Sequence, residues 1–151
     1  MRLTLLLRYP VAEIVAPIAV AMIFIALMSL VQEPMRRKIM VLMIAGAGAA
    51  YISGGGRGGW EFAFTAVLSI CAYLGFRWYA FIGVGWLLHT SWDVLHHVSG
   101  HPIIPFLPTS SFGCAVCDPV IALWCFAGAP ALITRSLFER SPVLAIEPDQ
   151  K

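Results

Sequence analysis

Long apolar stretches are the feature that most limits what this chain can fold into. A segment of roughly 17 to 25 apolar residues can cross the hydrocarbon core of a membrane as a helix, and a helix satisfies its own backbone hydrogen bonds there. Five such segments are present: Val11–Val31, Met35–Ile52, Trp60–Phe76, Trp78–Val98 and Pro119–Phe138. Hydrophobic residues make up 60% of the 151 residues and charged residues only 12%, a composition too apolar for a soluble globular domain. The sequence therefore predicts an all-α integral membrane bundle of about five transmembrane helices.

The breaks between these segments indicate the domain organisation. Proline, glycine and clustered cations interrupt the apolar runs, and the third and fourth segments follow each other so closely that we expect a tight antiparallel hairpin. The apolar run before Pro10 is too short for the core of a signal peptide, so we expect the N-terminal segment to be retained. We predict a single transmembrane domain over residues 1–140 and a short polar tail over residues 141–151.

The distribution of positive charge predicts the orientation. Cytoplasmic loops of membrane proteins carry an excess of lysine and arginine. One side of the predicted bundle has Arg36, Arg37, Lys38, Arg77, Arg135, Arg140 and Lys151, and the other has Arg2, Arg8 and Arg57. This bias places the C-terminus in the cytoplasm and the N-terminus outside. The cations form no continuous basic stripe, so we expect no nucleic-acid partner.

All four histidines of the chain lie at the end of the fourth segment, as His89, His96, His97 and His101, with Asp93 among them. At about 100° per residue, His89, Asp93 and His96 fall on one stripe of a helix, and His97 lies beside it. His89 and His96 are about 10 Å apart along the helix axis, too far for both to bind one ion with bonds near 2 Å. Asp93 therefore joins His89 in one site, joins His96 or His97 in another, or bridges two metals.

Acidic side chains from other segments reach the same side of the predicted bundle. Glu61 begins the third segment and Asp118 begins the fifth. Ionisable groups inside a bilayer are costly and usually functional, and imidazole and carboxylate suit zinc, iron, copper or manganese. We therefore predict a transition-metal site near the extracytoplasmic face, with Glu61 or Asp118 as the catalytic group for proton transfer. The predicted ligands are His89, Asp93, His96, His97 and His101.

Each of these residues also has a structural explanation. Intramembrane histidines often make hydrogen bonds between helices. Asp118 followed by Pro119 is typical of an N-cap with proline at the first helical position, and Glu61 in a first helical turn is favoured by the helix dipole. Cys114 and Cys117, just before Asp118, form a disulfide, a soft-metal pair or two small loop residues.

Distinctive strings occur between Leu30 and Ala129. They are EPMRRK, AGAGAAYISGG, WEFAFTAV, GVGWLLHTSWDVLHH and PTSSFGCAVCDPVIALW. These strings resemble a family of small bacterial integral membrane proteins classed as a domain of unknown function. The resemblance implies a bacterial inner-membrane protein and no particular chemistry.

A looser similarity connects the histidine cluster to another group of membrane proteins. The spacing of His89, Asp93, His96 and His97 resembles the histidine boxes of membrane fatty-acid hydroxylases and desaturases, which bind two irons. Those enzymes carry more histidines, spread over several boxes, whereas this chain has one such cluster. The departure argues against a desaturase-like reaction.

These observations support more than one class of function. The first is a metal-binding membrane protein, with oxidoreductase or hydrolytic chemistry on a membrane-dissolved or periplasmic molecule as its enzymatic form. The second is a non-enzymatic subunit of a larger membrane complex, and the third is a small transporter. The lipid bilayer is the expected partner in each case, and a homo-oligomer is compatible with all three.

Overall fold

The computed structural model describes residues 10–53, 56–104 and 106–133, and this part of the chain is all-α, with five α-helices and no strand. The helices are α1 (Val11–Ser29), α2 (Met35–Ala50), α3 (Gly59–Gly75), α4 (Tyr79–Val98) and α5 (Ser110–Phe126), and a short 3-10 helix, η2 (Tyr51–Ser53), continues α2. The predicted all-α class is confirmed. The predicted tail, residues 141–151, lies entirely outside the described residues.

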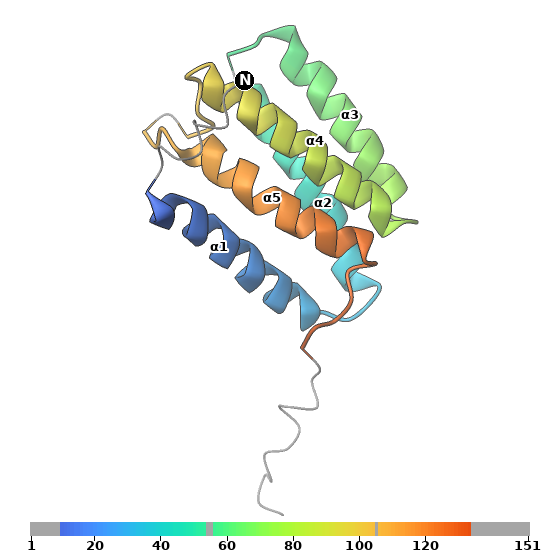
Figure 1. Cartoon of the computed structure of the whole chain (residues 1–151). Helices are drawn as coiled ribbons and strands as arrows, with labels where there is room; N and C mark the ends of the chain where they lie inside the picture. Colours follow the sequence, from blue (N-terminus) through green and yellow to red (C-terminus); the bar gives the residue numbers. More distant parts are fainter. Residues whose placement is uncertain (1–9, 54–55, 105, 134–151) are drawn as a thin grey trace, which may run out of the picture.

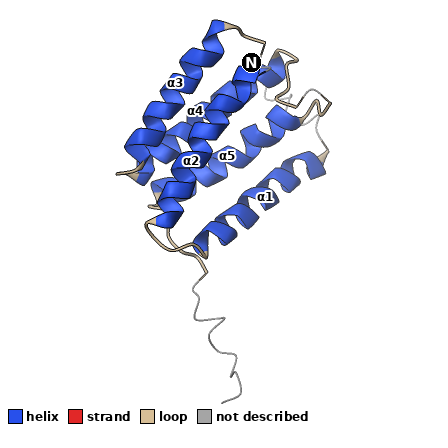
Figure 2. Ribbon diagram, turned by 180° about the vertical axis from the view of Figure 1, so that it is seen from behind, coloured by secondary structure: helices blue, strands red, loops and turns tan. Residues whose placement is uncertain are grey.

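The helices pack with their axes roughly aligned. Figure 1 shows α1, α5, α4 and α3 side by side, with α2 behind this row, and Figure 2 shows α2 from the back, where it packs against α3 and α4. Successive helices alternate in direction. As a result, the N-terminal ends of α1, α3 and α5 lie at the same end of the bundle as η2 and the C-terminal end of α4. We call this the site end.

Small residues allow the central helices to approach closely. A Cβ atom added at Gly83 of α4 would lie 3.1 Å from the carbonyl oxygen of Ala122 in α5 and 3.0 Å from the ring of Phe126. A Cβ atom at Gly85 would lie 2.6 Å from Ile44 in α2. The helices therefore pack closely around a core whose fully buried members include Met40, Ile44, Leu68 and Ile82.

The structure corrects the predicted fifth segment. The helix begins at Ser110 rather than Pro119, so Cys114 and Cys117 lie inside α5 instead of in a loop, and both are free thiols. Asp118 is correspondingly in the middle of the helix and is not its N-cap. The prediction was wrong because an Asp-Pro pair is typical of a helix start, although this helix accommodates its proline internally.

The end of α5 also differs from the prediction. The helix stops at Phe126, and Gly128 follows with a left-handed backbone. The amides of Gly128 and Ala129 donate to the carbonyls of Cys125 and Trp124, the pattern of a glycine-based C-cap. The bounds of the other four helices agree with the predicted segments to within two residues.

Among the described helices, α1 has the length and apolar composition of a membrane span. Helices α3 and α5 are apolar but shorter, at 17 residues each. A buried helix of a soluble protein or a signal sequence has the same two properties as α1. The structure therefore has five helices where five membrane spans were predicted, and one of these helices is long and apolar enough to cross a membrane.

Candidate metal centre

A buried group of three ionisable side chains lies between α4 and α5. His89 and Asp93 are one turn apart on α4, a spacing that places both on the same face of the helix, and Asp118 faces them from α5. Their exposed fractions are 3% for His89, 0% for Asp93 and 4% for Asp118. Each offers a ligand atom within 4.8 Å of the other two. We call these residues the His89–Asp93–Asp118 group.

One ring nitrogen of His89 is at the centre of this group. Its Nδ1 atom lies 2.7 Å from Oδ2 of Asp118 and 2.9 Å from Oδ2 of Asp93. The other ring nitrogen, Nε2, is buried and has no hydrogen-bond partner, and Oδ2 of Asp93 also lacks a partner of hydrogen-bond geometry. The group therefore contains buried polar atoms that the protein itself leaves incompletely satisfied, a costly arrangement unless another species binds there.

Tyr51, which the sequence analysis did not select, completes the surroundings of Asp93. Its hydroxyl donates to Oδ1 of Asp93 and lies 3.4 Å from Oγ of Ser111. Ser111 in turn accepts a hydrogen bond from the backbone amide of Ile103 at 3.0 Å. Tyr51 therefore fixes the orientation of one carboxylate, as a residue behind a metal ligand does.

The charges in the group are unbalanced. It contains two carboxylates and one imidazole, and no ion pair joins either carboxylate to a lysine or arginine in the part of the chain that the structure describes. If His89 is protonated and both aspartates are ionised, one negative charge is still uncompensated. Since an unpaired buried charge is expensive, a divalent cation bound by neutral His89 and two ionised aspartates would balance the charge.

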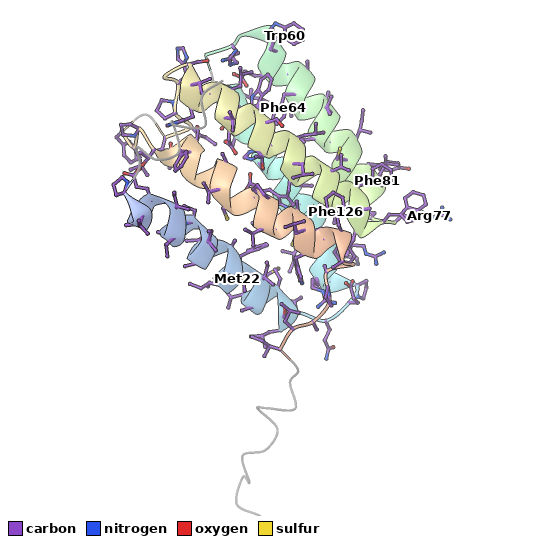
Figure 3. The ribbon with its side chains drawn as sticks, viewed as in Figure 1. Met22, Trp60, Phe64, Arg77, Phe81 and Phe126 are labelled. Atoms are coloured by element: carbon purple, nitrogen blue, oxygen red, sulfur yellow. The ribbon has the colours of Figure 1, made fainter. Side chains whose placement is uncertain are left out.

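Apolar rings enclose the group on the side of α3. Phe64, labelled in Figure 3, stacks on Trp92 with 4.4 Å between ring centroids and lies 6.2 Å from the ring of His89. The ring of Trp86 lies 6.0 Å from His89. These rings exclude water, and electrostatic interactions inside the site are correspondingly strong.

A second polar cluster lies nearer the site end. Glu61 is 3% exposed and accepts hydrogen bonds from Nε1 of Trp92 at 3.1 Å and from the backbone amide of Arg57 at 3.2 Å. Nε2 of His96 lies 3.3 Å from Glu61, while Nδ1 of His96 donates to the carbonyl of His101 at 3.2 Å. Glu61 and His96 are therefore close neighbours next to the ring of Tyr51, which stacks on His96, and they form an ion pair when His96 is protonated.

The remaining histidines lie outside the His89–Asp93–Asp118 group. The ring of His97 packs against Phe112, 5.4 Å away between centroids, and the side chain of His101 is exposed. Of the five predicted ligands, the structure thus brings His89 and Asp93 together. It adds Asp118, which the sequence suggested as a catalytic group rather than a ligand.

The available ligand atoms indicate which ions fit. One imidazole nitrogen and two carboxylate oxygens suit manganese, iron or zinc. A ligand set in which carboxylates predominate is less suited to copper. Ligand atoms around a tetrahedral ion with bonds of about 2.0 Å are about 3.3 Å apart. The three atoms would therefore have to spread slightly from the observed 2.7 and 2.9 Å. Three protein ligands leave at least one position for water or another molecule.

The fold and site define an all-α helical bundle with a buried His-Asp-Asp group that can hold a metal. Residues 12–131 match the model of a family of unknown function, DUF6010, and the chain belongs to this family. The membership expected from the strings between Leu30 and Ala129 is thereby confirmed. No curated protein and no solved structure matches the chain.

Proposed function

We propose that this protein is a membrane-embedded helical bundle that binds one divalent transition-metal ion between His89, Asp93 and Asp118. The observation that carries the proposal is the burial of two carboxylates against a single imidazole. A dication would balance the negative charges of the two aspartates and would give a partner to Oδ2 of Asp93, which lacks a hydrogen bond. Manganese, iron and zinc are the ions that suit this set of ligands best.

The site also has the features of a reactive metal centre. A bound dication with an open position would polarise a coordinated water and favour its deprotonation. Tyr51 holds Asp93 in place through its hydroxyl, and the rings of Phe64 and Trp86 exclude bulk water. Glu61 belongs to the neighbouring pair with His96, and its role as a proton acceptor stays a prediction. These features favour metal-dependent chemistry over a purely structural ion.

The outer surface of the helices supports the membrane placement. Met22 on the outer face of α1, labelled in Figure 3, is 51% exposed, and Phe62 and Leu123 on other helices are 63% and 70% exposed. Large apolar side chains exposed on several helices are unfavourable in water and suit contact with lipid. We expect a single domain within residues 1–140 and the lipid bilayer as its main partner.

The charge distribution supports one orientation of the bundle. Arg36, Arg37, Lys38 and Arg77 lie at the end opposite the site. At the site end, Arg57 is the one cation among the described residues. By the positive-inside rule this puts the site end outside the cytoplasm. We propose a multi-pass protein of a bacterial inner membrane, with its N-terminus outside and its C-terminus in the cytoplasm.

Single cysteines at position 109 and at position 139, which lies outside the described residues, test this orientation in a variant without the four native cysteines. A membrane-impermeant thiol reagent added to intact cells should label position 109 and spare position 139. Labelling of position 139 alone would show that the protein has the opposite orientation.

Metal titration of the purified, chelator-stripped protein tests the metal centre. The wild type should bind one manganese, iron or zinc ion per chain. Asp118→Asn, which nearly preserves the shape of the side chain, should weaken binding at least about tenfold, because it removes a charged ligand. His97→Gln is the matched control and should bind like the wild type. A wild type without stoichiometric binding would overturn the proposal.

A further inference from the structure

A pocket of about 510 Å³ lies between α1 and α5 at the site end, separate from the His89–Asp93–Asp118 group. Its walls are mostly apolar, with Pro17 and Val20 from α1, Phe112 from α5 and Ile104 from the connecting loop. Its volume is in the range of small-molecule binding sites. Val20 is also 58% exposed, so the pocket is continuous with the apolar outer surface of the bundle.

The pocket contains one acidic side chain. Glu13 lines it, and the Oε2 atom of Glu13 is buried without a hydrogen-bond partner. No lysine or arginine is among the described residues of the lining. A buried carboxylate oxygen without a donor is costly, and a ligand that brings a positively charged donor would remove that cost.

One face of α5 separates this pocket from the candidate metal centre. Cys114 and Cys117 line the pocket, and Asp118 follows directly on the face that meets α4. Cys117 and Asp118 are consecutive residues of α5, so the pocket and the buried carboxylates lie at the same level of this helix, on different faces.

We propose that the pocket between α1 and α5 binds a single-chain amphiphile from the bilayer, with an amine head group at Glu13 and its hydrocarbon chain along Pro17, Val20 and Phe112. The apolar walls match the chain, and the carboxylate matches the head group. This site goes beyond the proposed metal centre and rests only on the membrane placement.

Photo-crosslinking in phosphatidylcholine vesicles tests the proposal. The probe is a long-chain alkylamine with a diazirine on the chain, and the comparison is a fatty acid of the same length with the same diazirine. Mass spectrometry should find the alkylamine on the segments around Pro17 and Phe112, in clear preference to the fatty acid. Glu13→Gln should remove this preference while the chain still binds.

A variant that fills the pocket provides a second test of the proposal. A Cβ atom at Gly113 would have one neighbour within 4 Å, Pro17 at 3.8 Å, so a larger side chain there projects into the space of the pocket. Gly113→Leu should reduce crosslinking about tenfold, because the hydrocarbon chain loses its site. Gly46→Leu is the matched control, since a Cβ atom at Gly46 meets nothing within 4 Å. A cooperative unfolding transition in detergent, with a midpoint close to that of the wild type, would show that Gly113→Leu is folded.

Three results would overturn the proposal. If the protein does not float with the vesicles, the membrane placement fails, and this site fails with it. If the protein floats but Gly113→Leu and the wild type are labelled equally, the pocket alone fails. If labelling emerges only after residues 2–9 are removed, or only in a monomer separated from a dimer, the occupant is the start of the chain or a second copy rather than an amphiphile.

Discussion

The Nδ1 atom of His89 lies 2.7 Å from a carboxylate oxygen of Asp118, a residue 29 positions further along the chain on the neighbouring helix. The same nitrogen lies 2.9 Å from Asp93. A ring nitrogen carries at most one hydrogen, so it cannot donate fully to both carboxylates at once. A metal ion, by contrast, could be bound by all three side chains at once. This competition for one atom is why we interpret the group as a metal centre rather than a hydrogen-bonded packing contact.

Metal binding should make the stability of the protein depend on the ion. A ligand at a hundred times its dissociation constant stabilises the folded state by about 2.7 kcal/mol. Chelation should therefore lower the thermal unfolding midpoint of the wild type, and added manganese or zinc should restore it. In Asp118→Asn the midpoint should respond less to both treatments, because the ion is bound more weakly. A chelator effect of equal size in both proteins would place the ion elsewhere.

Tyr51→Phe should weaken metal binding while the bundle stays folded. The substitution keeps the ring that stacks on His96 and removes the hydroxyl that donates to Asp93. Loss of a hydrogen bond that orients a ligand costs about 10-fold to 100-fold in metal affinity, which a competition assay against a fluorescent chelator measures. Tyr73→Phe is the control, because Tyr73 is 74% exposed. Equal affinities in Tyr51→Phe and Tyr73→Phe would contradict the role of Tyr51.

Glu61→Gln should lower stability and leave metal content unchanged. Glu61 accepts hydrogen bonds from Trp92 and Arg57 and lies 3.3 Å from His96, outside the His89–Asp93–Asp118 group. Weakening these contacts should cost about 1 to 3 kcal/mol, measured as a shift of the denaturation midpoint in detergent. Loss of the bound ion from this variant would show that the two polar clusters form a single site.

Gly83→Ala should destabilise the contact between α4 and α5. The added methyl group would lie 3.1 Å from the backbone oxygen of Ala122, which cannot move without shifting α5. Overpacking of this kind costs about 1 to 3 kcal/mol. Gly46→Ala has open space around the new methyl group and should be neutral or stabilising by up to about 1 kcal/mol. Equal unfolding midpoints for the two variants would argue against close packing at Gly83.

The sequence predicted the parts of this fold that depend on local pattern. Apolar runs bounded by glycine, proline and cations predicted four of the helices, because such signals act within a few residues. The pair Asp118-Pro119 misled the prediction of the fifth helix. A proline after an aspartate is compatible with a helix start and with a helix interior, and only the packing of residues 110–117 against α1 and α4 distinguishes the two.

Part of the candidate site was also predictable, because it depends on a local sequence pattern. His89 and Asp93 are on one helix, so their shared face follows from the helical repeat. Tyr51 was missed because its contact with Asp93 spans 42 residues and depends on how η2 lies against α4. The pairing of His96 with Glu61 rather than with Asp93 likewise depends on the position of α3. The run of small residues from Ala45 to Ala50, just before Tyr51, is the available signal, since such a run is typical of close helix packing.

The X-ray absorption spectrum of the wild-type protein, loaded with one equivalent of zinc or manganese, shows which atoms bind the ion. We expect nitrogen and oxygen ligands, at about 2.0 to 2.2 Å for zinc, with the outer-shell scattering of a single imidazole from His89. A sulfur shell would make Cys114 or Cys117 a ligand, and scattering from two or more imidazoles would bring in another histidine. Either of these spectra, or the absence of a stoichiometric bound ion, would contradict a metal centre formed by His89, Asp93 and Asp118.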